Sequence, residues 1–229
     1  MIVGNGLLAK AFRSKFENVQ AVTIFASGVS NSSEIREAEF RRERTLLQDT
    51  IDRNKGSIVY FSTCSVSDAD RQSTPYVKHK MAAERLIGTQ TGGIVFRLPQ
   101  VVGRTDNPYT LTNFLARKIL RNEPFTIWDK AIRTLIDVDD VALIGTALIE
   151  RGSIGKTIDL CPPFSLTMLE LVKIMELVLA RPGRYKMVAR GGGSHSDASR
   201  TSQIAAELGI DFSHDYVERV LRKYYGEHY

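Results

Sequence analysis

The sequence contains very little cysteine: Cys64 and Cys161 are the only two in 229 residues. Two cysteines cannot form the disulfide framework of a small secreted protein, and their spacing matches no zinc motif, so we expect no metal. The chain has no apolar run near the ~18 residues of a membrane span. Its first residues lack the basic and apolar regions of a signal peptide. We therefore expect a cytoplasmic protein that does not enter a membrane.

The sequence also lacks a dense block of lysine and arginine with interleaved aromatic residues, so no nucleic-acid partner is predicted. Its formal net charge of +5 and pI of about 9.2 instead favour small anionic ligands such as phosphates. Hydrophobic residues make up 43% and charged residues 25%, which is ordinary for a globular protein. The length suits one domain with a full core, with room for a small additional lobe.

Short apolar runs alternate with amphipathic segments in the first hundred residues. Strands are expected at 1–3, 21–26, 57–61 and 94–97, and helices at 7–16, 33–54 and 75–88. This β-α-β-α-β-α-β alternation predicts an α/β fold with a Rossmann-like, doubly wound parallel sheet.

The remainder of the chain predicts a small mixed α/β lobe. Helices are expected at 111–121, 138–151, 165–179 and 216–225, and strands at 125–128, 134–136 and 157–160. Residues 181–200 contain Pro182 and a run of three glycines, so a mobile loop is predicted there. Trp128 is expected to pack in a core. Asp137, Asp139 and Asp140 fit the N-cap and first turn of a helix better than a metal site.

A glycine motif, Gly4-x-Gly6-x-x-Ala9, lies between the first strand and the first helix. Glycines at such a turn let the backbone approach a pyrophosphate, which then sits at the helix N-terminus. Any tight turn from a strand into a helix also favours glycine. The motif alone therefore leaves a phosphate site and a plain turn both open.

Two further features carry candidate chemistry. Tyr76 and Lys80 are four residues apart on a predicted helix and share a face, and a nearby ammonium lowers the pKa of a phenol. Tyr76 is thus a candidate general acid or base. The hydroxyl cluster Ser62–Ser65 ends a buried strand, at the edge where open α/β sheets bind ligands. Each feature alone also fits an ordinary surface, and His79 is expected to be a surface residue.

The order of the glycine loop, hydroxyl cluster and Tyr-x-x-x-Lys helix resembles the extended short-chain dehydrogenase/reductase family. That family contains NAD(P)-dependent sugar-nucleotide epimerases, dehydratases and reductases. Three further stretches are similar to family segments: Phe96–Gly103 beside the nicotinamide, Arg133–Ala142 with an arginine for the nucleotide diphosphate, and Ala26–Ser30 near the cofactor ribose. The resemblance implies an enzyme with NAD or NADP as cofactor and a nucleotide-activated sugar as substrate, as in polysaccharide biosynthesis.

The resemblance also implies roles for individual residues. Tyr76 would transfer a proton, Lys80 would bind the nicotinamide ribose and lower the pKa of Tyr76, and Thr63 would orient the substrate oxygen, with Ser62 or Cys64 as alternatives to Thr63. The cofactor site would comprise Gly4, Asn5, Gly6, Leu7, Leu8, Ala26, Ser27, Lys80, Leu98 and Pro99, and the substrate site Ser65, Asn113 and Arg133. Residues 1–103, with part of 131–160, would form the cofactor domain and 104–229 mainly the substrate lobe, although the chain also counts as one domain.

The sequence departs from this family between the glycine loop and the hydroxyl cluster, where only one strand is expected. About two βα units, on the order of 60 residues, are missing, and with them the part that normally holds the adenosine. No acidic residue stands ~20 positions after the glycines, so NAD and NADP are not distinguished. A non-redox module that binds nucleotide sugars but no dinucleotide is therefore the alternative function.

Two expectations follow from comparison with the family pattern. Dehydratases carry an Asp-Glu pair after the central hydroxyl residue, but Cys64 and Ser65 follow Thr63 here, which favours epimerisation or carbonyl reduction over dehydration. In the family, the helices matching 33–54 and 75–88 commonly form a dimer, so a homodimer is predicted.

Overall fold

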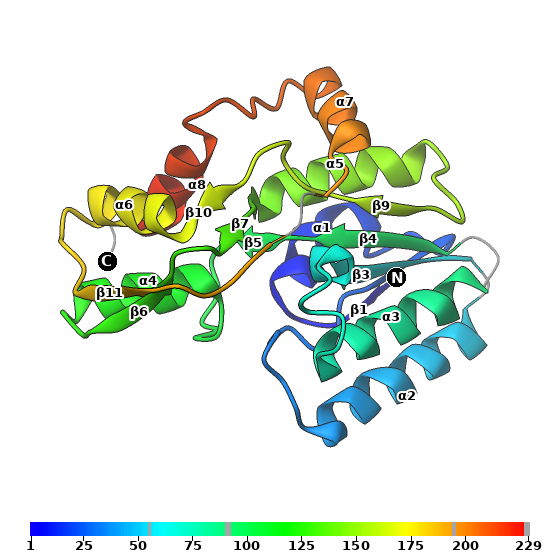
Figure 1. Cartoon of the computed structure of the whole chain (residues 1–229). Coiled ribbons are helices and arrows are strands. Elements are labelled where there is room, and N and C mark those ends of the chain that lie inside the picture. The colour runs from blue at the N-terminus through cyan, green and yellow to red at the C-terminus, as the bar shows by residue number, and fades with distance from the viewer. Residues whose placement is uncertain (55, 90–92, 194–195, 227–229) are drawn as a thin grey trace.

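A computed structural model describes residues 1–54, 56–89, 93–193 and 196–226 of the chain. Its centre is a parallel five-stranded sheet, which confirms the predicted doubly wound α/β class (Figure 1). In spatial order the strands are β1 (Ile2–Val3), β2 (Val22–Phe25), β3 (Ser57–Thr63), β4 (Ile94–Leu98) and β9 (Thr157–Asp159). Strand β3 is apolar along most of its length because it is buried on both faces of the sheet.

Helices cover both faces of this sheet. Phe61 of β3 packs in one cluster with Phe12, whereas Tyr60 packs in another with Leu47, because successive residues of a strand point to opposite faces. The first face carries α1 (Leu7–Phe16), α5 (Val138–Glu150) and α7 (Ser199–Glu207), and the second carries α2 (Glu37–Arg53) and α3 (Pro75–Gly88).

Strand β1 forms one edge of the sheet. Within the described residues it pairs with β2 alone, through Ile2 opposite Ile24 and Val3 opposite Phe25. In the usual dinucleotide-binding order 3-2-1-4-5-6, the strand before the glycine turn is central, with two strands beyond it. Those two strands are absent because the chain passes from the end of α1 at Phe16 directly to β2. The predicted shortening in the adenosine-binding half is confirmed.

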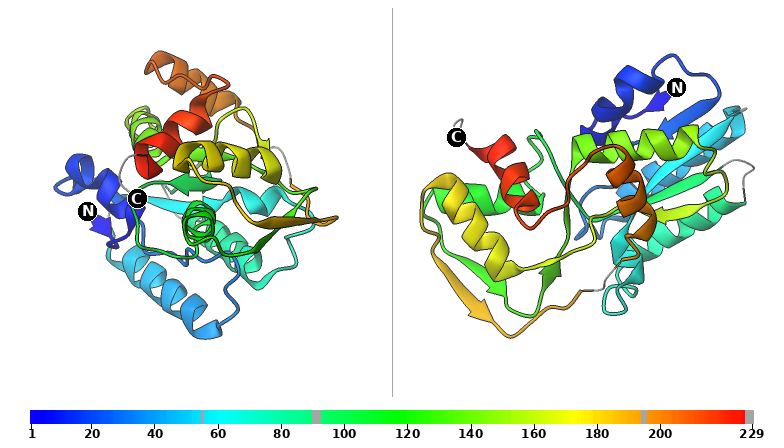
Figure 2. Two further views of the ribbon diagram at one scale, coloured as in Figure 1. Left: turned by 90° about the vertical axis from the view of Figure 1, so that its left-hand side faces the viewer. Right: turned by 90° about the horizontal axis from the view of Figure 1, so that it is seen from above.

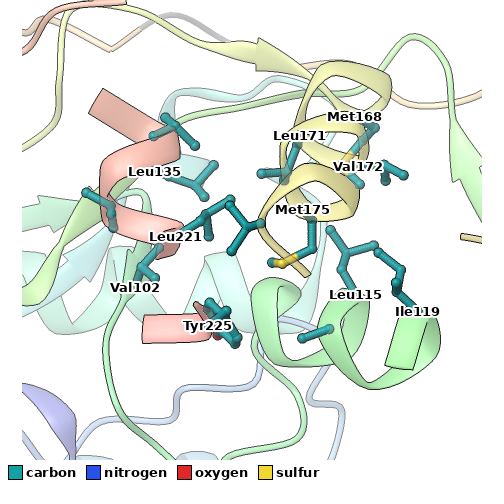
Figure 3. Packing of buried hydrophobic residues seen from close by; sticks show 14 of the residues in the cluster. Val102, Leu115, Ile119, Leu135, Met168, Leu171, Val172, Met175, Leu221 and Tyr225 are labelled. Atoms are coloured by element: carbon teal, nitrogen blue, oxygen red, sulfur yellow. The ribbon is translucent and has the colours of Figure 1, made fainter. Parts of the chain in front are cut away.

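Beyond β4 the chain builds a lobe with a core of its own. Helix α6 lies beside α8 in both views of Figure 2, and side chains of α4, α6 and α8 meet in the cluster of Figure 3, including Leu115, Met175 and Leu221. The lobe elements are α4 (Leu111–Leu120), β6 (Phe125–Trp128), β11 (Tyr185–Val188), α6 (Met168–Leu179) and α8 (Tyr216–Tyr225). Two short ladders join the lobe segments, β5 (Gln100–Val102) with β8 (Leu135–Asp137) and β7 (Ile132–Arg133) with β10 (Leu166–Thr167).

The region expected to be a mobile loop, 181–200, contains one strand and the start of a helix, while its other described residues lie outside helices and strands. Residues 185–188 form β11, which pairs in parallel with β6, and α7 begins at Ser199. The strand was missed because it is short and partly exposed, which hides any alternating pattern. Trp128 was also misjudged: it is 42% exposed, and the Arg190 guanidinium lies 5.1 Å from its ring centre.

The three aspartates at 137, 139 and 140 begin helix α5, as predicted. Asp137 is the N-cap, and its side chain accepts a hydrogen bond of 2.9 Å from the backbone N–H of Asp139. They also anchor α8, because Lys223 donates to Asp137 and Asp139 at 2.7 and 2.6 Å. None of the helices in the described part of the chain has the length and apolarity that crossing a membrane requires.

Candidate active site

A cavity of about 460 Å³ opens at the carboxyl ends of the sheet strands, the edge where open α/β sheets bind ligands. The turn before α1, the loop after β2, the end of β3, the start of α3 and the loop after β4 all line it. Most predicted site residues meet there: Asn5, Gly6, Leu7, Leu8, Ala26, Ser27, Thr63, Ser65, Tyr76, Lys80, Leu98 and Pro99.

The glycine turn shapes one end of this cavity. Gly4 has a φ of 121°, and a Cβ at this position would run into the carbonyl group of Ala26, so only glycine fits. Gly4 makes the turn without lining the cavity. Gly6 is the N-cap of α1 and provides no side-chain cap, and a Cβ placed on it would meet nothing within 4 Å. The first turn of α1 therefore has no side-chain cap and lines the cavity with Gly6, Leu7 and Leu8, an arrangement that suits a diphosphate.

Tyr76 lies in the first turn of α3. The Thr74 hydroxyl caps this helix by accepting from the Val77 N–H, and Pro75 suits its first position. Tyr76 is 7% exposed, and it lines the cavity beside Thr63 at the end of β3, whose hydroxyl acts to lower the pKa of Tyr76. Of the neighbouring candidates, Ser62 donates to Glu84 and Cys64 points to a backbone carbonyl. Thr63 is therefore the hydroxyl residue that meets Tyr76.

Lys80 shares the buried face of α3 with Tyr76, as the spacing predicted, but it points to other partners. Its Nζ donates to Glu43 Oε1 and the Tyr60 hydroxyl, both at 3.0 Å, and to the Phe61 carbonyl at 3.4 Å. Burial and the Glu43 charge raise the pKa of Tyr76, against a smaller lowering by Thr63. This is the opposite of the lowering expected from Lys80.

Glu43 is the central group that the sequence did not reveal. It is completely buried, and its Oε2 accepts from the Val29 N–H at 2.6 Å and lies 2.9 Å from His79 Nε2. Burial opposes ionisation, but the Lys80 ammonium and the surrounding donors outweigh it and hold the pKa of Glu43 below its usual range. The expectation of a surface His79 was wrong, because its ring packs on Phe40, 4.9 Å between centres, beneath α2.

Arg133 lies in a second, smaller cavity of about 70 Å³ that shares Ser65, Pro99 and Gln100 with the first. Its guanidinium donates to the carbonyls of Ile132 and Gly192 at 2.6 and 3.5 Å, and no carboxylate within the described residues forms an ion pair with it. Burial and the neighbouring charge of Arg71 lower the pKa of Arg133. Arg71 and Arg133 line this small cavity together with the Asp68 carboxylate, so its cations exceed its anions by one, which favours an anionic ligand.

Asn113 does not line either cavity. Its Nδ2 donates to the carbonyls of Thr105 and Asn107 at 2.7 and 2.9 Å, and its Oδ1 accepts from Tyr225 at 2.6 Å. It thus holds the loop 105–110, which does line the larger cavity. A direct contact of Asn113 with substrate stays a prediction.

The model of the NAD-dependent epimerase/dehydratase family matches residues 6–161. The chain belongs to this family. Among curated protein sequences, none matches it.

Solved structures with a similar fold include 4-epimerases of nucleotide sugars. UDP-N-acetylglucosamine 4-epimerase from Bacillus cereus has a TM-score of 0.72 at 15% identity, over 97% of this chain and 93% of that one. UDP-glucuronic acid 4-epimerase from Bacillus cereus, in complex with UDP-glucuronic acid and NAD, has a TM-score of 0.66 at 16% identity, over 94% of this chain and 81% of that one. RMD from Pseudomonas aeruginosa, in complex with NADPH, has a TM-score of 0.66 at 18% identity, over 96% of this chain and 85% of that one.

The sequence motifs of this family member do not reveal several residues that lie in or directly behind the two cavities. Arg42 lies on α2 with a guanidinium nitrogen 3.3 Å from the Ser27 carbonyl, and Arg71 faces Arg133. Tyr60 donates to Glu43 at 2.6 Å. For Glu43 a signal existed: the buried positions of α2 are Phe40, Glu43, Leu47 and Thr50, a spacing that places Glu43 on the apolar stripe.

Proposed function

We propose that the protein is an oxidoreductase that uses NAD or NADP to epimerise or reduce a nucleotide-activated sugar. One observation carries this proposal: a single cavity joins the uncapped start of α1 to the Tyr76–Thr63 pair. An anion-binding backbone and a proton-transferring hydroxyl within one cavity are what such a reaction needs. The cofactors and UDP-sugar bound by proteins of similar fold agree with it.

Each part of the cavity has a distinct task in this proposal. The N–H groups of Asn5–Leu8 hold the diphosphate, Ala26 and Ser27 lie beside the ribose, and Leu98 and Pro99 pack beside the nicotinamide ring. When bound, the nicotinamide supplies or accepts a hydride. Thr63 orients the substrate oxygen, and Tyr76 moves the proton to or from that oxygen. Cys64 and Ser65 offer no carboxylic acid, which favours epimerisation or carbonyl reduction over dehydration.

The adenosine end of the cofactor has less support. The diphosphate and nicotinamide positions match the cavity lining, but β1 is an edge strand, and among the residues that the structure describes no further strand lies beyond it to enclose the adenosine. This observation also favours the second candidate function, a module that binds a nucleotide sugar without redox chemistry.

Calorimetric titration with NAD, NADP and their reduced forms separates the two functions. We expect a Kd in the micromolar range for at least one form. Since adenosine meets little protein, nicotinamide mononucleotide should bind within about tenfold of the matching dinucleotide, that is within about 1.4 kcal/mol. Absence of binding at millimolar concentration, with affinity for a nucleotide sugar retained, would favour the module.

Arg133 is proposed to hold the substrate phosphate. Replacing it with alanine should raise the KM or Kd for the nucleotide sugar by about tenfold or more, near 1.4 kcal/mol, because two charge-assisted hydrogen bonds are lost. Arg133→Lys should recover only part of the lost affinity for the nucleotide sugar, since an ammonium lacks the planar fork of a guanidinium. Cofactor affinity should not change.

The control for this experiment is Arg190→Ala, which removes a guanidinium that stacks on the exposed Trp128. It should leave sugar-nucleotide affinity unchanged. If Arg133→Ala also binds like the parent protein, Arg133 does not contact the phosphate.

A homodimer through α2 and α3 is also proposed. The exposed face of α2 is strongly charged, with ion pairs such as Arg42–Glu39 at 3.4 Å. An interface there would be more polar than most homodimer interfaces.

A further inference from the structure

The turn before α3 carries the second cation of the smaller cavity, Arg71. The backbone N–H of Arg71 donates to the Asp68 carbonyl at 2.9 Å, and its carbonyl accepts from the N–H and the hydroxyl of Thr74 at 3.0 and 2.8 Å. The Thr74 hydroxyl oxygen also accepts from the Val77 N–H and so caps the helix that carries Tyr76. The turn therefore fixes the backbone of Arg71 relative to the start of α3.

Both arginines of this cavity have N–H groups that the protein does not use. The guanidinium of Arg71 makes no hydrogen bond or ion pair within the described residues, although Arg71 is only partly exposed. Arg133 donates to two backbone carbonyls, both through Nη1, so its Nε and Nη2 have no acceptor in the described part of the chain. These N–H groups are available to a ligand.

The charges and donors of the smaller cavity suit a phosphate group. Arg71 and Arg133 line it with one carboxylate, Asp68, so positive charge is in excess. The hydroxyls of Thr134 and Ser165 also line it, 2.6 Å apart, and because one donates to the other, one O–H stays free. Burial and then the charge of Arg71 lower the pKa of Arg133. A bound anion would relieve this repulsion between the two cations.

The smaller cavity adjoins the larger one. The two share Ser65, Pro99 and Gln100 in their linings, and Thr63 and Tyr76 line the larger cavity. A phosphate group in the smaller cavity therefore lies beside the space where the reacting sugar would meet the two hydroxyls.

We propose that Arg71 is a second phosphate-binding residue, which together with Arg133 receives the diphosphate of the nucleotide-activated sugar in the smaller cavity. This proposal rests on the proposed function, because it assigns a residue to the substrate of that reaction. Arg71 comes from the turn before α3 and Arg133 from β7 of the lobe, so the diphosphate joins the two parts of the chain. Since the same turn caps α3, Arg71 sets the position of the phosphate relative to Tyr76.

The test is a calorimetric titration with inorganic pyrophosphate, carried out on the full chain without cofactor or sugar. We expect the parent protein to bind pyrophosphate and Arg71→Gln to weaken the binding by at least about tenfold, near 1.4 kcal/mol. Arg71→Lys should recover only part of this affinity, because it restores the charge without the planar fork. An unchanged Kd for Arg71→Gln, or no binding by the parent at millimolar concentration, overturns the proposal.

The matched control is Lys78→Gln. Lys78 is an exposed cation on α3 and is not among the residues that line either cavity. Its removal changes the net charge as Arg71→Gln does, so it should leave the Kd for pyrophosphate unchanged. A loss as large as that of Arg71→Gln would show an effect of net charge alone and would overturn the proposal.

The start of α1 is a second place where pyrophosphate can bind, so a further arm identifies the site. In the Arg133→Gln background the shared site is already broken, and adding Arg71→Gln should change the Kd by less than about threefold. A full tenfold loss in this background would place Arg71 at a different site and contradict the proposal.

A stability measurement separates binding from a structural role. Pyrophosphate should raise the thermal unfolding midpoint of the parent protein more than that of Arg71→Gln, because a ligand stabilises the form that binds it. Equal increases in the two proteins would overturn the proposal.

These experiments need neither cofactor nor turnover, so their failure differs from failure of the proposed function. If Arg71→Gln weakens pyrophosphate binding but no nicotinamide dinucleotide binds, the redox function fails while the phosphate site stands. If a dinucleotide binds and Arg71→Gln leaves pyrophosphate binding unchanged, the redox function stands and Arg71 is not part of the substrate site.

Discussion

Replacing Tyr76 by phenylalanine is expected to lower kcat on a nucleotide sugar by about 10²–10⁴-fold, the usual contribution of a positioned acid or base. The phenyl ring fills the same buried space at the start of α3, so the fold and the binding of both ligands should persist. Steady-state kinetics with separate binding titrations measure this directly. The loss should lie in kcat, with Kd values within about threefold of the parent.

The control for Tyr76→Phe is Tyr185→Phe on β11, which removes a hydroxyl far along the chain in the lobe. Its kcat should match that of the parent. Full activity of Tyr76→Phe on the identified substrate would remove Tyr76 from the mechanism.

Replacing Glu43 by alanine is expected to cost about 3–5 kcal/mol of unfolding free energy, because the Lys80 ammonium is left buried without a counter-charge. Denaturant unfolding followed by circular dichroism measures the change. Removing the ammonium as well, in Glu43→Ala/Lys80→Met, should restore part of the stability, so the two changes are not additive. A loss in the double variant equal to the sum of the losses of Glu43→Ala and Lys80→Met alone would show that the charges do not interact.

Glu37→Ala provides the comparison on the same helix. Glu37 forms an exposed ion pair with Arg44, so its removal should change the unfolding free energy far less than removal of Glu43. The pH dependence of the Glu43 effect has a definite sign. Because the folded protein holds the pKa of Glu43 below its ordinary value of 4.5, the stabilisation is complete above that pH and is lost as the pH falls through the lower, folded value. The stability gap between the parent protein and Glu43→Ala should therefore narrow in acid.

The first hundred residues were predictable because their signals are local. Continuous apolar runs such as Ser57–Phe61 fix a buried strand, and a glycine that must adopt a positive φ fixes the turn after β1. The meeting of Thr63 with Tyr76 follows from the same logic, since a strand end and the next helix start share one edge of the sheet.

The buried cluster around Glu43 was not predictable in this way. Glu43 stands in a helix rich in Glu and Arg, where a charged residue is expected to face solvent. Its three side-chain partners come from β3 and α3, and a fourth partner is the Val29 N–H in the loop after β2. Only the three- and four-residue spacing from Phe40 to Leu47 marks its side of the helix. The burial of His79 depends on its contacts with Glu43 and Phe40 of α2. Strand β11 forms by pairing with the edge of β6. Such contacts between distant segments leave no local pattern.

The edge position of β1 has a consequence for the handedness of the crossover from β1 through α1 to β2. The connections β1–α1–β2, β2–α2–β3 and β3–α3–β4 step across the sheet in one direction, yet α1 lies on the opposite face from α2 and α3. The first crossover must therefore have the opposite hand to the other two. Since ~98% of such crossovers are right-handed, we infer that the two consecutive crossovers through α2 and α3 are right-handed and that β1–α1–β2 is left-handed. When two βα units are removed from a doubly wound sheet and every remaining element keeps its place, a left-handed connection is what remains, and here it carries the glycine turn.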